Sequence, residues 1–168
     1  MINKRFLVVG SNSFSGSHCV NQLLRKGFEV WGISRSVEPN KIFLPYKSLD
    51  KYTLNRFFFK SLNLKSDLNP ILELIDKNKI SHVINFAAQG MVAESWNKPL
   101  DWYQTNLMSQ IAFHEELRKR ENIEKYVHIT TPEVYGDTKD TCIKENNHFE
   151  PSTPYAVSRA ACDLHLQS

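Results

Sequence analysis

The chain has 168 residues, of which 41% are hydrophobic and 23% charged. This length is typical of one domain, and the hydrophobic content with 11% aromatic residues excludes a disordered chain. The formal net charge is only +3, and lysine and arginine form no long run, so the sequence predicts no nucleic-acid partner.

No apolar run approaches the roughly 20 residues that a membrane helix needs, and the first residues lack the features of a signal peptide. The three cysteines lie far apart, and no cluster of cysteine and histidine has the spacing of a metal site. We therefore expect a reduced, cytoplasmic protein with no membrane partner and no metal.

Short apolar runs alternate along the chain with segments of helical periodicity. The expected strands are residues 6–9, 29–33, 57–62, 82–88 and 126–130. The expected helices are residues 17–26, 71–77, 99–120 and 155–167. In the second of these helices, we expect Asn69 as the N-cap and Pro70 as the first helical residue.

Residues 136–154 are rich in glycine, asparagine and proline, which predicts a loop. Alternation of strands and helices predicts an α/β fold, in which a doubly wound parallel sheet of Rossmann type carries helices on both faces.

A turn of small residues follows the first expected strand and leads into the first helix. Free backbone N–H groups and the helix dipole converge at such a turn, which therefore favours an anion. Gly10 allows the tight turn and Gly16 allows close packing of helix and strand, whereas Ser13 stands where a GxxGxxG pattern has its middle glycine. The Ser13 Cβ holds the backbone away from a phosphate, although its hydroxyl has a hydrogen bond to donate.

We interpret this turn as the pyrophosphate site of a dinucleotide, because it lies within a strand–helix–strand unit. The alternative is a loop of small residues without a ligand. The residues of the turn are Gly10, Ser11, Asn12, Ser13, Phe14, Ser15 and Gly16.

Arg35 stands at the end of the second strand, the position that meets the adenosine ribose in this fold. An acidic residue there would bind the 2′-hydroxyl of NAD, whereas Arg35 with its neighbour Ser36 suits the 2′-phosphate of NADP. We therefore favour NADP. The alternative is NAD, with Arg35 stacked on adenine or exposed to solvent.

Polar residues that suit catalysis follow the fifth strand. Thr131 and Glu133 lie at its carboxyl end, which borders the ligand crevice of a doubly wound sheet. Tyr155 and Arg159 are four residues apart, so both side chains project from one helix face. Lowering a tyrosine pKa from about 10 to about 7 takes roughly 4 kcal/mol, which a nearby cation and an oxidised nicotinamide can supply together.

Taken in order, these segments resemble the extended short-chain dehydrogenase/reductase family, in the branch that modifies nucleotide sugars. Residues 85–89 are similar to its NLAAQ segment, which lines the cofactor. Residues 131–136 resemble its ST(D/S)EVYG segment, and residues 154–159 resemble its PYAxSK segment. Asn63 and Leu64 stand where the family has Asp-Leu beside the adenine.

The resemblance implies a role for each matched residue. Tyr155 exchanges the proton of a sugar 4-hydroxyl while C4 gives a hydride to the nicotinamide, and Thr131 bonds the same oxygen. Glu133 removes or returns the C5 proton, which a C4 ketone makes acidic. Met91 and Glu94 follow the strand that lines the cofactor, and by this position they join Thr131 and Glu133 as candidate substrate contacts. The implied cofactor contacts outside the glycine turn are Arg35, Asn63, Leu64, Ala87, Ala88, Gln89, Thr130, Tyr155 and Arg159.

The sequence departs from the family pattern at several positions. Ser13 replaces a glycine, and Arg159 replaces the lysine that holds the nicotinamide ribose, a change that keeps the charge but alters its shape. Pro132 replaces the acid of glucose-type 4,6-dehydratases, although GDP-mannose-type dehydratases also lack that acid. Asn106 matches an asparagine that orients the catalytic region through backbone contacts, or else it is a polar residue on a solvated face.

Family members are about twice as long as this chain. We therefore expect residues 1–168 to be the dinucleotide-binding domain of a longer enzyme, without its last parallel strand and its C-terminal substrate lobe. The resemblance favours a 4,6-dehydratase that acts as a homodimer on a nucleotide sugar. A 4-epimerase, reductase or decarboxylase is the alternative within the family, and a catalytically weak or inactive NAD(P)-binding module is the alternative outside it.

Overall fold

A computed structural model of the protein describes residues 4–137, 142–146 and 148–168. The chain divides into two compact units. The sheet unit comprises Met1–Ala87 and Glu116–Ile129, and the helical unit comprises Ala88–Glu115 and Thr130–Ser168. Part of the expected loop at residues 136–154, namely 138–141 and 147, lies outside the described residues.

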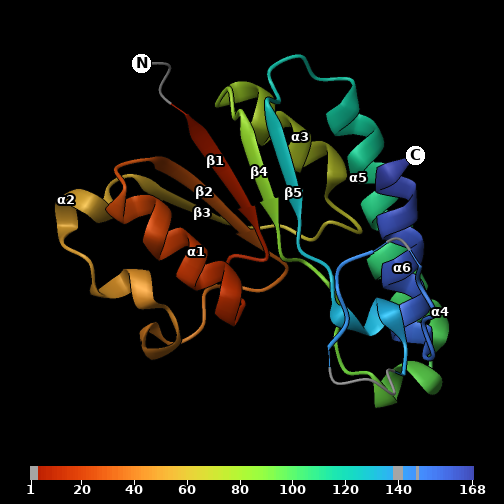
Figure 1. The fold of residues 1–168 in the computed structure, drawn as a ribbon. Helices are drawn as coiled ribbons and strands as arrows, with labels where there is room; N and C mark the ends of the chain where they lie inside the picture. Colours follow the sequence, from red (N-terminus) through yellow and green to blue (C-terminus); the bar gives the residue numbers. More distant parts are fainter. Residues whose placement is uncertain (1–3, 138–141, 147) are drawn as a thin grey trace. The chain divides into compact units, whose positions relative to one another are not determined.

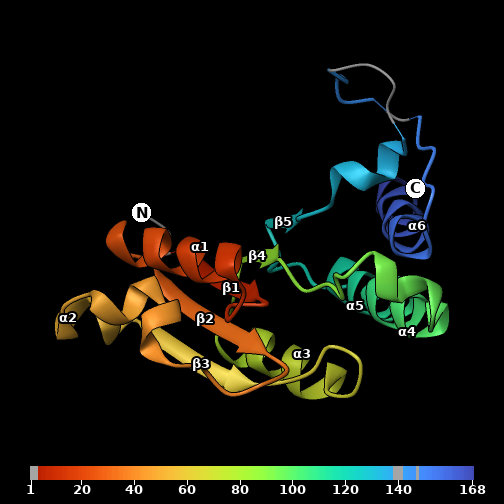
Figure 2. The same cartoon turned by 90° about the horizontal axis from the view of Figure 1, so that it is seen from below.

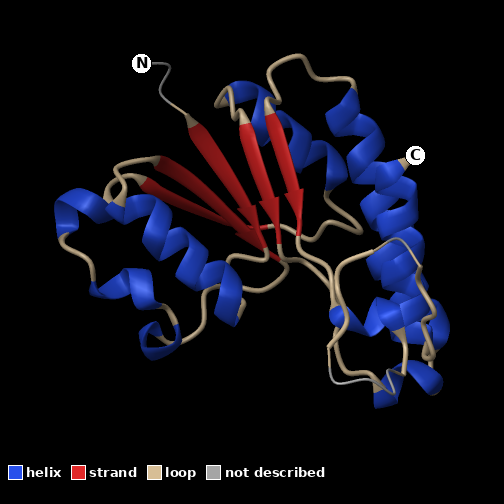
Figure 3. Cartoon of the chain, viewed as in Figure 1, coloured by secondary structure: helices blue, strands red, loops and turns tan. Residues whose placement is uncertain are grey.

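The sheet unit contains a parallel five-stranded sheet in the order β3-β2-β1-β4-β5. Because every pair is parallel, the carboxyl ends of all the strands lie along one edge (Figure 3). The strand order reverses between β1 and β4, and this reversal is where sheets of this kind bind ligands. The strands are β1 (Arg5–Val9), β2 (Glu29–Ser34), β3 (Phe57–Ser61), β4 (His82–Asn85) and β5 (Lys125–His128).

Helices cover both faces of this sheet, which confirms the doubly wound fold. Helix α1 (Phe14–Arg25) lies on one face and α3 (Leu68–Lys77) on the other (Figure 2). The central strand β1 is buried between them, and the side chains of Leu7 and Val8 are fully inaccessible. This burial on both sides explains why β1 is apolar without alternation.

The segment between β2 and β3 contains three short elements that the sequence analysis did not predict. They are the 3₁₀-helices η1 (Lys41–Phe43) and η2 (Pro45–Ser48) and the single-turn helix α2 (Lys51–Leu54). Tyr46 is buried in the core beside α1, and its hydroxyl donates to the carboxylate of Glu38 at 2.6 Å. Elements this short carry no hydrophobic periodicity from which to predict them.

Two helices begin earlier than expected. Helix α1 begins at Phe14 because the Ser13 side chain accepts a hydrogen bond from the Gly16 amide and caps the helix. Helix α3 begins at Leu68 after Asp67, so the expectation of Asn69 as N-cap and Pro70 as the first residue is wrong. Pro70 falls in the first turn, where an amide has no partner within the helix and a proline is tolerated.

The helical unit contains η3 (Ala93–Trp96), α4 (Pro99–Tyr103), η5 (Pro132–Tyr135) and α6 (Pro154–Gln167), and α6 packs against the other three (Figure 1). The helix expected over residues 99–120 is interrupted by a π-helical turn, η4 (Gln104–Met108), before it continues as α5 (Ser109–Arg118). Single π-helical turns inside α-helices are frequent at functional sites. None of the helices in the described part of the chain has the length and apolar character that spanning a membrane would require.

Candidate functional site

The glycine turn of the sheet unit has a backbone that only glycine fits at two positions. Gly10 has a φ of 80°, and a Cβ built on it would lie 3.0 Å from the amide nitrogen of Ala87. A Cβ on Gly16 would lie 2.2 Å from the carbonyl oxygen of Gly10. The turn therefore holds the start of α1 close to the ends of β1 and β4, which is the arrangement that a diphosphate site requires.

Ser13 uses its hydroxyl within the turn. The Oγ donates to the Gly10 carbonyl at 2.8 Å and accepts from the Gly16 amide at 3.0 Å. The hydrogen bond that we expected this hydroxyl to offer a phosphate is thus given to the protein. In the described part of the chain, the structure shows no acceptor for the amides of Phe14 and Ser15 in the first turn of α1. These two N–H groups suit an anion.

Asn12 fastens the loop after β2 to the glycine turn. Its Nδ2 donates to the carbonyl oxygens of Ser36 and Val37, each at 3.0 Å, and its backbone amide donates to the Ser34 hydroxyl. Arg35 lies between these contacts and is exposed. The structure thus holds Arg35 beside the turn with its side chain accessible, whereas Ser11 is buried beneath the turn.

The remaining predicted cofactor residues of the sheet unit follow two strand ends. Asn63 and Leu64 come after β3 and are half-buried, and the Asn63 Oδ1 accepts from the Lys65 amide at 3.0 Å. Ala87 comes after β4, where its amide donates at 2.9 Å to the side chain of the fully buried Asn85. All of these residues therefore lie at the carboxyl edge of the sheet.

In the helical unit, both backbone groups of Tyr155 are bound by side chains. Its amide donates to the Ser95 hydroxyl at 3.1 Å, and its carbonyl accepts from the Ser158 hydroxyl at 2.6 Å. Asn106, which is fully buried, donates from Nδ2 to the Ser158 Oγ at 3.1 Å. The same amide group accepts from the Gln89 backbone N–H at 2.7 Å and donates to its carbonyl at 3.0 Å.

These contacts decide between the two interpretations of Asn106. It is no solvated residue but a buried bridge in the π-helical turn, which links the backbone after β4 to the start of α6. The network joins two residues predicted to contact the cofactor, Gln89 and Tyr155, within one unit.

Arg159 is only 2% exposed, although a guanidinium is rarely buried so completely. We expected Tyr155 and Arg159 to project from one face of a helix; both lie in α6, where Tyr155 is half-buried and Arg159 is buried. One turn further along α6, burial raises the pKa of Asp163, while the bond from Thr130 and the charge of Arg159 oppose that rise. The hydroxyl of Thr130 donates to the Asp163 carboxylate and so ties the segment after β5 to α6.

Thr131 and Glu133 lie at the start of η5. The Thr131 hydroxyl accepts from the Glu133 amide at 3.3 Å and caps this short helix. Glu133 is exposed and Thr131 is half-buried. Because η5 packs against α6, the structure brings both residues into the element that neighbours the Tyr155 helix.

The predicted substrate residues Met91 and Glu94 belong to the segment that follows Gly90. Met91 is 67% exposed and has a φ of 66°, a left-handed conformation that is uncommon for a methionine. The Trp102 indole donates to the Gly90 carbonyl at 2.7 Å and fixes the beginning of the segment. Glu94 lies in η3 and is exposed.

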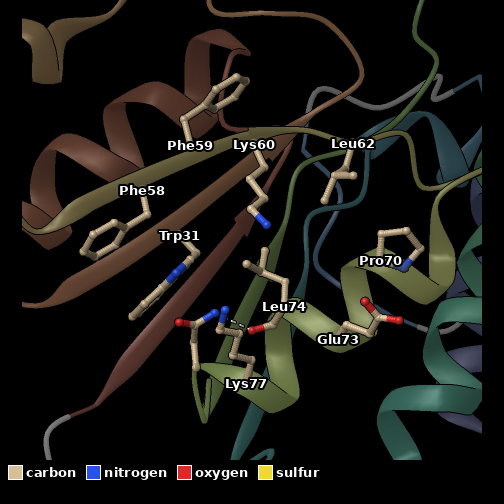
Figure 4. Close-up of a pocket in the computed structure, with 10 residues that line it drawn as sticks. Trp31, Phe58, Phe59, Lys60, Leu62, Pro70, Glu73, Leu74 and Lys77 are labelled. Carbon is tan, nitrogen blue, oxygen red and sulfur yellow. Dashed lines mark hydrogen bonds between the residues drawn. The ribbon is translucent and has the colours of Figure 1, made fainter.

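A groove of about 500 Å³ lies elsewhere in the sheet unit, between the strands β2 and β3 and helix α3 (Figure 4). Trp31, Phe58 and Lys60 project into it from the strands, and Leu74 from the helix. None of the predicted site residues lines it. The roles of Ser95 and Asp163 were not predicted, because single serine and aspartate residues in a sequence carry no signal of what they contact.

Comparison with known proteins identifies the family of the chain. The family model of GDP-mannose 4,6-dehydratase matches residues 7–168. The GDP-mannose 4,6-dehydratase of Vibrio cholerae is 29% identical over 161 residues, which is 94% of this chain and 43% of that protein.

Solved structures show the same fold. The UDP-glucose 4-epimerase of Thermus thermophilus, crystallised with NAD, is 27% identical to this chain, and the two structures superpose with a TM-score of 0.80. The matched region is 97% of this chain and 50% of the epimerase chain. The dTDP-glucose 4,6-dehydratase of Streptomyces venezuelae, also with NAD bound, is 26% identical, with a TM-score of 0.80. The matched region is 96% of this chain and 50% of the dehydratase chain. The chain thus spans about half the length of these proteins or less.

A glycine turn at the carboxyl edge of a parallel sheet, a tyrosine held through Asn106 and a family model that covers nearly every residue support one assignment. The chain belongs to the GDP-mannose 4,6-dehydratase family, within the extended short-chain dehydrogenases/reductases that include nucleotide-sugar dehydratases and epimerases.

Proposed function

We propose that this protein contributes the dinucleotide-binding and catalytic part of an enzyme that transiently oxidises C4 of a nucleotide sugar, and that the reaction is a 4,6-dehydration. The observation that carries this proposal is that side chains bind both backbone groups of Tyr155. Its amide donates to Ser95, its carbonyl accepts from Ser158, and Asn106 donates to the Ser158 hydroxyl. A catalytic base must be held within hydrogen-bond reach of the proton that it removes.

The glycine turn fits a nicotinamide dinucleotide. Gly10 and Gly16 leave no room for a Cβ, and the amides of Phe14 and Ser15 in the first turn of α1 have no acceptor among the described residues. When bound, the oxidised nicotinamide would accept the hydride from C4. We propose NADP, because Arg35 is exposed beside the turn and no acidic residue stands in its place. NAD remains the alternative.

The chain's own residues would then move the protons. Tyr155 would take the proton of the 4-hydroxyl while Thr131 donates to the same oxygen, which leaves a ketone at C4. The Glu133 carboxylate would take the C5 proton, which this ketone makes acidic, and would pass it to the departing 6-hydroxyl, which leaves as water. Return of the hydride to C6, with a proton delivered to C5 in exchange for the one that Tyr155 took, would balance the reaction and give a 4-keto-6-deoxy sugar.

Glu133 separates dehydration from epimerisation, because inversion at C4 needs no base at C5. Glu133 is exposed and stands beside the capping Thr131, so its carboxylate is accessible. The test uses the product of the complete reading frame with GDP-, dTDP-, UDP- and CDP-sugars. We expect a 4-keto-6-deoxy product that Glu133→Gln abolishes, and turnover that survives this substitution would refute the assignment.

A second function is supported by two observations on the cofactor side. The Ser13 hydroxyl accepts the hydrogen bond of the Gly16 amide, so that this N–H is not free for a phosphate, and Arg159 is buried where the family has lysine. Both are compatible with an NAD(P)-binding module without catalysis. Calorimetric binding of NADP with no turnover of any nucleotide sugar would support this module over the dehydratase.

The expected homodimer and the expected substrate lobe also remain proposals. Apolar side chains of α6, such as Leu164 and Leu166, are exposed and are compatible with a subunit contact. Sedimentation of the complete product tests the dimer directly, and a monomer at micromolar concentration would refute it.

A further inference from the structure

Ser95 is a fully buried serine of the helical unit that has no assigned role. Its Oγ accepts a hydrogen bond from the Tyr155 amide at 3.1 Å and donates one to the Val92 carbonyl at 2.6 Å. One hydroxyl therefore joins two segments that lie 60 residues apart in the chain.

The first turn of α6 explains why this contact is needed. The turn begins at Pro154, which has no N–H. The N-cap Thr153 satisfies two of the amides that follow, because its Oγ1 accepts from Ala156 at 3.1 Å and its carbonyl accepts from Val157 at 2.8 Å. The amide of Tyr155, between Pro154 and Ala156, has no acceptor in Thr153, and the Ser95 hydroxyl accepts its hydrogen bond.

Ser95 also belongs to the segment that carries the candidate substrate contacts. It stands next to Glu94 in η3, and Met91 precedes it in a left-handed conformation. The Trp102 indole holds the carbonyl of Gly90 at the beginning of the same segment. Residues 90–95 are thus fixed at one end by an indole N–H and at the other by the Tyr155 peptide.

We propose that Ser95 is a positioning residue, which sets the distance between the Tyr155 phenol and the segment that carries the candidate substrate contacts Met91 and Glu94. This inference rests on the proposed function. Ser95 does not touch the reacting atoms; it acts through the Tyr155 peptide, whose carbonyl is held independently by Ser158. With only that second contact left, the start of α6 is free to shift, and displacements of about 1 Å in a catalytic group can cost about a hundredfold in rate.

Three variants of the complete reading-frame product test the proposal. Ser95→Ala removes the hydroxyl, and Ser95→Thr keeps it. Ser81→Ala is the matched control, because Ser81 is also buried and hydrogen-bonded but lies just before the amino end of β4, at the opposite end from the carboxyl edge of the sheet. Amide hydrogen exchange at Tyr155 and steady-state kinetics are measured for each variant.

We expect Ser95→Ala to speed exchange of the Tyr155 amide at least tenfold and to lower kcat at least tenfold with KM changed less than threefold. Ser95→Thr restores both, and Ser81→Ala changes neither. Unchanged exchange in Ser95→Ala, or faster exchange with unchanged kcat, would overturn the positioning role. If the unsubstituted protein turns over no nucleotide sugar, the proposed function fails instead, and the exchange measurement still decides whether Ser95 holds Tyr155.

Discussion

Replacing Gly16 with alanine places a methyl carbon 2.2 Å from the carbonyl oxygen of Gly10 and 2.8 Å from the Ser13 Oγ. The first of these neighbours is backbone, so the turn and the start of α1 must move apart. Overpacking of this kind costs about 1–3 kcal/mol, and a contact with backbone lies at the upper end of that range. Alanine in place of glycine in a helix returns up to about 1 kcal/mol. We therefore expect a net loss of about 1–2 kcal/mol in unfolding free energy.

The same displacement moves the amides of Phe14 and Ser15 away from the phosphate position, so we expect NADP affinity to fall at least tenfold. Urea unfolding measures the stability, and isothermal calorimetry measures the affinity. Gly90→Ala is the matched control, because a Cβ there meets no atom within 4 Å and the expected change in stability is below about 0.5 kcal/mol. A Gly16→Ala protein that is as stable as the parent and binds NADP equally well would refute this account of the turn.

Lys79 lies two residues after the end of α3 and has a φ of 49°, and Gly27 occupies the same position after α1 with a φ of 89°. Lys79→Gly should therefore raise the unfolding free energy in urea by about 0.5–1 kcal/mol, and Gly27→Ala should lower it by a similar amount. Ser13→Gly frees the turn amide that the hydroxyl now occupies, so calorimetry should show NADP binding several-fold tighter at a cost of a few tenths of a kcal/mol in stability; weaker binding would contradict the proposed competition. Burial, and then the charge of His165, lower the pKa of His114 to about 4. The unfolded chain therefore takes up this proton at a higher pH than the folded protein, and the free energy of unfolding should fall by up to about 3 kcal/mol between pH 6.5 and pH 4. In urea titrations over the same pH range, the His114→Gln protein should lose less stability.

The sheet unit was predictable because its signals are local. Continuous apolar runs such as that around Val8 indicate buried parallel strands, and Gly10 follows the first of them directly. The segment over residues 41–54 was not predictable. Its order depends on Tyr46 packing beside α1 and on the bond to Glu38, and neither contact has a periodic signature.

The candidate site was predictable where a residue type is tied to a chemical role. Thr131, Glu133 and Tyr155 stand out by the segments that carry them, whereas the contact of Ser95 with Tyr155 spans 60 residues and leaves no local pattern. The burial of Arg159 was also unexpected, because a guanidinium favours solvent unless the fold surrounds it with polar groups.

The most direct test of the central claim follows one hydrogen atom. Nucleotide sugars labelled with deuterium at C4 are incubated with the complete reading-frame product and NADP, and the product is examined by NMR. Oxidation at C4 followed by dehydration predicts a 4-keto-6-deoxy sugar with the deuterium at C6. Deuterium that stays on C4 of an epimerised sugar, or that remains in unreacted substrate, would contradict the account.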